Sequence, residues 1–152
     1  MKKYSKFIAI FAVALFLTAC SRQVNMDQPD ANGNYDFSDS YLGFSLILPK
    51  EFDHYQFQRV DKADYSDLEF FVPTSDTSIP KEVPGYGEPI IVRVYNKSAW
   101  DGSDQKNSGF VKIGEKGDKV YAMEFWQKIP KDWQSVWNDN MKNEIKNSFK
   151  IN

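Results

Sequence analysis

Cys20 is the only cysteine among the 152 residues of the chain. A chain with one thiol forms no internal disulfide, so the fold has to be stabilised by a hydrophobic core instead of by covalent cross-links. The cysteine directly follows an apolar run near the N-terminus, and the longer part of the chain comes after it. It therefore divides the sequence into a short leader and one long segment that has to fold through side-chain packing.

The leader has the three parts of a secretory signal peptide. Lys2, Lys3 and Lys6 form a basic start without an acidic residue, and residues 7–17 (FIAIFAVALFL) form an apolar run before two small residues. A helix that spans a bilayer needs about twenty apolar residues, and this run is roughly half that length. We therefore expect residues 1–19 to be a signal peptide that is removed, in preference to a retained membrane helix.

The residues at the end of the leader are Leu17, Thr18, Ala19 and Cys20, and they resemble the lipobox of bacterial lipoproteins. This resemblance implies that diacylglycerol is attached to the thiol of Cys20 and that the chain is cut before it. Two or three acyl chains together hold a protein on a membrane, whereas a single chain does so only marginally. The alternative is a cysteine that follows an ordinary signal peptide by chance.

Ser21 and the charge of the mature chain indicate where the protein is located and which classes of partner it can have. Ser21 stands where the inner-membrane retention signal of enteric bacteria has an aspartate, which favours the outer membrane in a diderm organism. In other bacteria the lipid would hold the protein on the outer face of the cytoplasmic membrane. Without the three lysines of the leader, 16 basic and 21 acidic residues remain, a formal charge of −5. This balance disfavours a nucleic-acid partner, so contact with the membrane is expected through the lipid.

The composition changes again along the mature chain. Residues 20–40 are mostly polar, and we expect them to be a flexible tether that holds the domain about 25 Å from the lipid. An ordered strand is the alternative for the last few of these residues. Residues 41–152 have the composition and the length of one globular domain.

Alternating and β-branched segments in this domain predict strands. The strands are expected at residues 44–48, 55–60, 68–72, 90–95, 110–113 and 119–127. The connection of residues 73–89 contains four prolines and is longer than usual, which is typical of a loop that is either functional or disordered. A short helix or turn is expected around residues 98–105.

The C-terminal segment has the period of a helix. Its apolar residues recur at spacings of three and four and would form one face. These residues are Trp133, Val136, Trp137, Met141, Ile145 and Phe149. Pro130 and Asp132 suit the start of a helix, so we expect a helix over residues 131–147, with a short strand or a docked ring at residues 148–151. The expected fold class is therefore α+β, an antiparallel sheet packed by a C-terminal amphipathic helix.

Two segments of the domain carry a resemblance to a known family. Residues 42–49 (LGFSLILP) lead into the first strand, and residues 145–150 (IKNSFK) close the chain. These segments resemble the opening and the close of PsbP-like domains in bacterial lipoproteins. The resemblance implies an α/β/α sandwich around an antiparallel sheet. Members of that superfamily serve as binding or assembly modules, and they offer no catalytic residue to assign to this chain.

Few residues of the chain suggest catalysis. His54 is the only histidine, so it cannot by itself form an imidazole metal site, and the G-x-S-x-G motif of serine hydrolases does not occur. Asp67 and Glu69 could share one face of a strand, as a glycosidase carboxylate pair does, and the alternative is a solvated acidic strand edge. The glycines match no phosphate or dinucleotide loop. We therefore expect no catalytic residue, no metal and no cofactor.

Aromatic side chains make up 16% of the chain, and some of them lie outside the expected core elements. Loop aromatics beside polar groups can bind sugars, peptides or a partner protein. The candidates for such contacts are Tyr65, Tyr86 and Trp100. A ring that folds back onto the domain is the alternative for each of them.

These features predict a membrane-anchored extracytoplasmic lipoprotein, exposed to the periplasm or the cell surface, that acts as a non-enzymatic binding or assembly module. Its partner would be an envelope protein or a glycan. One alternative is an envelope hydrolase that uses a carboxylate pair on a glycan or a peptide. Another is a purely structural lipoprotein without a specific ligand.

Overall fold

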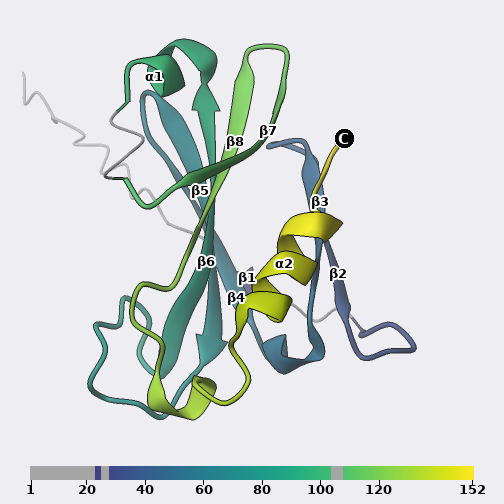
Figure 1. Cartoon of the computed structure of the whole chain (residues 1–152), viewed down its shortest axis with the longest axis vertical. Coiled ribbons are helices and arrows are strands. Elements are labelled where there is room, and N and C mark those ends of the chain that lie inside the picture. The colour runs from purple at the N-terminus through teal and green to yellow at the C-terminus, as the bar shows by residue number, and fades with distance from the viewer. Residues whose placement is uncertain (1–22, 25–27, 104–107) are drawn as a thin grey trace, which may run out of the picture.

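The computed structural model describes residues 23–24, 28–103 and 108–152 (Figure 1). The expected signal peptide and lipobox lie outside the described residues. None of the helices in the described part of the chain has the length and the hydropathy of a membrane-spanning segment.

Six strands form the larger of two antiparallel sheets, in the order β1–β4–β5–β6–β8–β7 (Figure 1). The strands are β1 (Gln23–Val24), β4 (Gln56–Asp61), β5 (Tyr65–Pro73), β6 (Tyr86–Asn96), β7 (Val111–Lys116) and β8 (Lys119–Phe125). The central strand β6 contains the run IIVRVY, whose β-branched residues favour an extended backbone. All the strands expected from the sequence have a counterpart in the structure, and β5, β6 and β7 are longer than expected.

Three shorter strands, β2 (Tyr35–Asp39), β3 (Phe44–Leu48) and β9 (Lys150–Ile151), form the second antiparallel sheet. β1 and β2 both lie within the expected flexible tether, so that expectation is wrong for residues 23–24 and 35–39, and the alternative of an ordered strand describes residues 35–39. Tyr35 and Phe37 alternate with exposed residues along β2, and both are buried in the main core. The burial of these two rings provides the apolar area that stabilises β2, although most residues around them are polar.

The C-terminal helix is shorter than its pattern predicted. In place of a helix over residues 131–147, the structure has a 3-10 turn, η2 (Lys131–Trp133), followed by an α-helix, α2 (Asp139–Ser148). Asn138 is the N-cap of α2, and its side-chain oxygen accepts a hydrogen bond from the backbone N–H of Met141 at 3.1 Å. This cap satisfies one of the unpaired N–H groups of the first turn and starts the helix at the following residue. The helix prediction was therefore right in kind and wrong in extent.

The large sheet has two different faces. Alternate residues of β5 and β6, such as Leu68, Phe70 and Val92, point to a face that we call inner, and they belong to the main core cluster. The small sheet and α2, which lies beside β3, contribute side chains to the same cluster (Figure 1). The intervening residues, among them Asp67 and Arg93, point to the opposite or outer face. The fold is thus α+β, with two antiparallel sheets and few helices.

Two further short helices complete the fold. η1 (Lys50–Phe52) follows β3, and α1 (Lys97–Asp101) directly follows β6 at one end of the large sheet (Figure 1). α1 covers part of the expected helix or turn around residues 98–105. Its Trp100 packs with Val120 and others into a second, smaller core cluster on the outer face. This cluster places α1 above the strands that carry the candidate site.

The long connection between β5 and β6 is ordered and docks onto the segment before α2. Asp132 accepts hydrogen bonds from the hydroxyl of Thr74 at 2.7 Å and from the backbone N–H of Ser75 at 2.8 Å. In return, Asp76 accepts a hydrogen bond from the backbone N–H of Lys131 at 2.9 Å. That bond, with others from its own turn, lowers the pKa of Asp76 to about 2. The reciprocal contacts argue against a disordered loop and give the connection a structural role.

Candidate binding site

An ion pair between Arg93 and Asp67 lies at the centre of the outer face. The two residues are opposite each other on β6 and β5. Arg93 donates hydrogen bonds from Nε and Nη2 to the two carboxylate oxygens of Asp67, at 2.6 and 2.8 Å, and the side chains are only 19% and 7% exposed. Burial alone would lower the pKa of Arg93, but the hydrogen bonds and the charge of Asp67 outweigh it and raise the pKa above its ordinary value. The pair is therefore a neutral and geometrically fixed unit.

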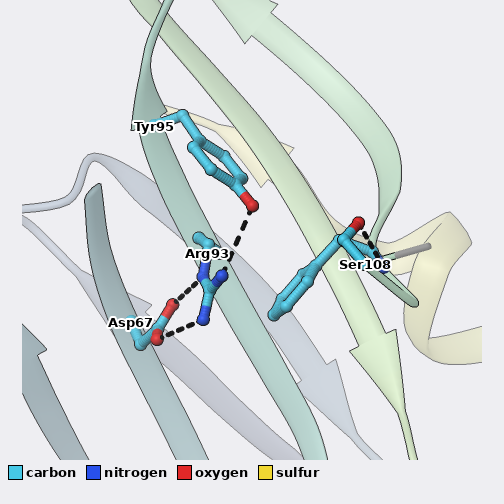
Figure 2. Close-up of polar contacts among 5 residues, drawn as sticks. Asp67, Arg93, Tyr95 and Ser108 are labelled. Atoms are coloured by element: carbon cyan, nitrogen blue, oxygen red, sulfur yellow. Dashed lines mark hydrogen bonds and ion pairs between the residues drawn. The ribbon is translucent and has the colours of Figure 1, made fainter. Parts of the chain in front are cut away.

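Aromatic rings enclose the guanidinium of Arg93. Its Cζ lies 3.9 Å from the ring centroid of Tyr65 and 4.2 Å from that of Phe110. Nη1 of Arg93 donates to the hydroxyl oxygen of Tyr95 at 3.4 Å, and Figure 2 shows this contact beside the ion pair with Asp67. Stacking on aromatic faces and bidentate pairing both suit the planar guanidinium. These contacts come from different segments of the chain and together hold one side chain in place.

A hollow of about 740 Å³ opens beside this cluster, between the outer face and α1. The described lining residues that bear on its chemistry are Asp64, Tyr65, Arg93, Tyr95, Ser98, Ser103 and Ser108. Its volume lies within the range of about 300–1,000 Å³ that is typical of small-molecule sites. The hollow combines ring surfaces, hydroxyl groups and a neutralised cation, which are groups that bind a ligand through stacking and hydrogen bonds.

Trp100 supports the hollow and is not exposed for contact with a partner. It lies in α1, is 7% exposed, and packs edge-on against Tyr95 with ring centroids 5.2 Å apart. The prediction that Trp100 is a loop side chain available to a partner is therefore wrong, and the alternative of a ring that folds back describes it. The preceding strand ends where α1 begins, so the indole holds the helix against the end of the sheet.

The structure separates the two tyrosine candidates. Tyr65, at the start of β5, lines the large hollow, whereas Tyr86 lines another hollow of about 260 Å³ that also contacts Phe71 and Glu88. Tyr65 is opposite Tyr95, and Tyr86 is at the other end of β6. At the usual rise of a strand, Tyr86 and Tyr95 are about 30 Å apart. Of the three aromatic candidates, Tyr65 is therefore the one whose ring stacks on Arg93.

The sequence did contain a signal for the residues that were missed. Arg93 interrupts the apolar run IIVRVY, and its position predicts an outward side chain in an otherwise buried strand. A buried arginine needs an acidic partner, and Asp67 is the buried acid of the neighbouring strand. The contributions of Tyr95 and Phe110 depend on strand order and on the path of the chain after α1, which periodicity does not reveal.

Asp67 and Glu69 share the outer face of β5, but they have different partners. Both oxygens of Asp67 are engaged by Arg93, whereas Glu69 accepts a hydrogen bond from Nε2 of Gln58. Burial raises the pKa of Glu69 above its ordinary value, against the effect of that hydrogen bond. The two carboxyl groups are thus in different environments, and one of them is held in an ion pair.

A further acid on this face was not expected from the sequence. Glu88 is half-buried, and burial together with the charges of Glu69 and other nearby acids raises its pKa to about 8. Glu88 lies between the hollow that contains Tyr86 and a smaller one of about 190 Å³ that contains Glu124. A carboxyl group in this environment is largely protonated at neutral pH.

His54 lies away from these hollows, on the turn after η1. Its side chain is 82% exposed and stands 3.5 Å from Asp53. Over residues 28–103 and 108–152, no cluster of histidine, cysteine, aspartate and glutamate side chains is arranged to hold a metal ion.

Comparison of the chain with known protein families, with curated proteins and with solved structures found no significant match in any of the three.

Proposed function

We propose that the chain is a membrane-anchored extracytoplasmic lipoprotein and that it acts as a non-enzymatic binding module through the hollow beside Arg93. The observation that carries this proposal is the fixed floor of the hollow. Tyr65, Phe110 and Asp67 hold one guanidinium from three sides, so the floor is preorganised and loses little conformational entropy when a ligand binds. The surrounding hydroxyl groups supply orientation.

The anchor is supported by the leader and by the single thiol of the chain. We expect the mature protein to begin at an acylated Cys20, because the preceding residues resemble a lipobox. Mass spectrometry of the membrane fraction measures this directly, with Cys20→Ser as the control that should leave the leader attached. A mature chain that retains Met1, or that carries an unmodified Cys20, would contradict the anchor.

We also propose that the domain is PsbP-like. The support comes from the Gly-Phe opening of β3, from the C-terminal helix with its short final strand, and from the positions of the helices. α2 shares the core of the inner face, and α1 packs on the outer face. One helix on each side of an antiparallel sheet is compatible with an α/β/α sandwich.

The envelope hydrolase is the less well supported alternative. It needs one carboxyl group that gives a proton and a second that acts on the substrate or on water. Asp67 is poorly placed for either role because both its oxygens accept hydrogen bonds from Arg93. The alternative of a structural lipoprotein without a ligand does not account for the large hollow beside this pair.

The binding role is tested in cells that carry the intact lipoprotein. A photo-crosslinking amino acid at Ser98, an exposed lining residue of the hollow, should give a cross-linked species. As a control, the photo-crosslinking amino acid is placed instead at the exposed position of His54, on the turn after η1, where it should not give that species. In the protein with the cross-linker at Ser98, the substitution Tyr65→Ala should reduce the yield of the cross-linked species, because it removes a ring from the floor of the hollow. Equal products from both positions, or none from Ser98, would contradict the proposal.

A further inference from the structure

The first described strand follows closely on the expected lipid anchor. β1 is paired antiparallel to β4, with Gln23 opposite Phe57 and Val24 opposite Gln56. Gln23 is the third residue after Cys20. Because an extended chain spans at most about 3.6 Å per residue, the Cα atom of Cys20 is within about 11 Å of that of Gln23, whatever the path between them. A lipid on the thiol of Cys20 would therefore start close to the sheet.

A free tether would hold the domain farther from the lipid. If the chain were flexible as far as the start of β2, residues 20–34 would separate the lipid from the fold by about 20 Å on average. With β1 paired to β4, only Ser21 and Arg22 stand between the lipidated residue and the large sheet. β1 is an edge strand of that sheet, so the acyl chains would hold this edge at the membrane.

Two side chains beside this edge suit the boundary between lipid and water. Because β1 is antiparallel to β4, its N-terminal end points along β4 toward Arg59, which is about 7 Å beyond Phe57. The guanidinium of Arg59 lies 4.1 Å from the ring centroid of Tyr41, and Tyr41 is 65% exposed. Tyrosine is enriched at membrane–water interfaces, where the stem of an arginine can lie along apolar groups while its charge stays in water. The two side chains can thus lie among lipid headgroups without the burial of a charge.

The charges beside this edge do not select a particular lipid. Arg59 pairs with Asp61 at 3.3 Å, and Lys62 and Asp64 are both exposed on the connection from β4 to β5. Positive and negative charges are thus balanced here, and the mature chain as a whole is acidic. An attraction to anionic headgroups is therefore not what would bring the edge to the membrane. The covalent lipid and its short connection to β1 would do so.

We infer that the edge formed by β1 and β4 lies against the surface of the membrane, with Tyr41 and Arg59 at the level of the lipid headgroups. This inference rests on the proposed lipid anchor, and the surface it names is the bilayer that holds the acyl chains of the same molecule. The opposite edge strand, β7, would be about 24 Å from β1 along the sheet, at the usual spacing of strands. Arg93, on β6, would be about 14 Å from β1, so its hollow would open close above the membrane.

Paramagnetic relaxation from the lipid surface measures this orientation. The mature lipoprotein is placed in phosphatidylcholine nanodiscs in which some lipids carry a gadolinium chelate on the headgroup, and NMR measures the relaxation of the backbone amides. The effect of gadolinium falls steeply with distance, and β4 and β7 are about 19 Å apart along the sheet. The enhancement at Phe57 and Arg59 should therefore be at least about tenfold larger than at Lys112 on β7. The amide of Tyr41 should follow that of Arg59.

Two inserts of the same length distinguish a paired β1 from a free one. A flexible Gly-Ser segment of about ten residues between Arg22 and Gln23 lengthens the connection from the lipid to β1, so the enhancement on β4 should fall severalfold toward the value on β7. The same segment between Met26 and Asp27, after β1, leaves that connection as it is and should leave the enhancement on β4 unchanged. If β1 were unpaired in solution, the two inserts would lengthen the same tether and would have equal effects.

Three outcomes would overturn the inference. They are equal enhancement on β4 and β7, larger enhancement on β7, and equal losses from the two inserts. In each of these cases the proposed anchor stands as long as the mature chain begins at an acylated Cys20. If mass spectrometry finds an unmodified Cys20, the anchor and the inference fail together. An enhancement on β4 that only the insert before β1 removes supports the inference.

Discussion

The two faces of the large sheet are built from alternate residues of the same strands, and they have different chemistry. On the inner face of β5, Leu68, Phe70 and Val72 are each 0% exposed and join one continuous core. On the outer face the same strand carries Asp67, in an ion pair, and Glu69. The only cysteine of the chain is Cys20, which precedes the folded domain, so the domain has no disulfide and the inner face provides the stability. The outer face can then hold polar groups that would be too costly in the core.

The largest expected effect comes from removing a ring from the inner face. Phe70 packs against Phe37, Tyr55 and Phe57 with ring centroids 4.9, 6.2 and 6.5 Å apart. Phe70→Ala should therefore lower the free energy of unfolding by about 3–5 kcal/mol, because it leaves a cavity among rings that cannot collapse. Denaturant unfolding measures the loss.

The neighbouring residue Phe71 is the matched control for this prediction. It is as deeply buried as Phe70, but it points to the outer face, beside a hollow of about 260 Å³. Phe71→Ala would enlarge a space that already exists and is open to solvent, so its cost should be nearer 2 kcal/mol. Equal losses from Phe70→Ala and Phe71→Ala would show that both faces stabilise the domain to the same extent.

The contrast between the faces also explains what the sequence could predict. The strand over residues 44–48 was expected because it is a short apolar segment closed by Pro49, and the strand over residues 90–95 because it is rich in β-branched residues. The structure confirms both. β2 was expected only as the alternative to a flexible tether, because its core contribution is only Tyr35 and Phe37 between polar residues. The alternation of Tyr35 and Phe37 with polar residues is visible in the sequence, but it is too short to predict a strand without knowing that β3 pairs with this segment.

The helix prediction failed for a related reason. Trp133 and Trp137 fall on the expected apolar face and are buried, yet they lie before α2. Backbone N–H groups of Val136 and Trp137 donate to the carbonyl of Trp133, so a local turn explains the helical spacing without a continuous helix. The rings of Trp133 and Trp137 then pack with Trp126, at centroid distances of 5.4 and 5.1 Å. In the same way, the pairing of Arg93 with Asp67 depends on the register between two strands and is absent from the local sequence.

A smaller effect is expected from the buried ion pair of the outer face. Arg93→Met should cost about 3 kcal/mol, because it leaves the carboxylate of Asp67 buried without a partner. The double variant Asp67→Leu with Arg93→Met should recover most of this loss, since neither charge then remains. Thermal unfolding of the single and double variants gives the coupling between the two residues. A double variant that is less stable than Arg93→Met would show that the pair itself stabilises the outer face.

Arg59 provides the control for this cycle. It also pairs with an acid, Asp61, at 3.3 Å and stacks over Tyr41 at 4.1 Å, but its side chain is 39% exposed. Arg59→Met should therefore change the stability by less than about 1 kcal/mol, because an exposed ion pair is screened by water. If it costs as much as Arg93→Met, burial is not the reason for the larger effect.

An effect smaller than that of Arg93→Met is expected from Glu88, and it depends on pH. Glu88 faces Glu69, Glu82, Asp67 and Glu124, and burial with these charges raises its pKa from 4.5 to about 8. Below pH 4.5 the carboxyl is protonated in both the folded and the unfolded chain, so it has no net effect. As the pH rises from there to about 8, the unfolded chain loses this proton first, and the stability falls. Glu88→Gln removes this loss and should stabilise the protein at pH 8 by about 2 kcal/mol, after discounting for partial exposure.

Melting curves of Glu88→Gln and the parent chain at pH 5 and pH 8 separate this effect from a general change in packing. The variant should melt only slightly above the parent at pH 5, where the loss has just begun, and clearly above it at pH 8. Glu115→Gln is the opposite case, because hydrogen bonding and pairing with Lys112 lower the pKa of that exposed carboxyl. It should give no gain at pH 8. If Glu88→Gln and the parent have equal melting temperatures at both pH values, the outer face does not raise the pKa of Glu88. The two faces would then differ in packing alone.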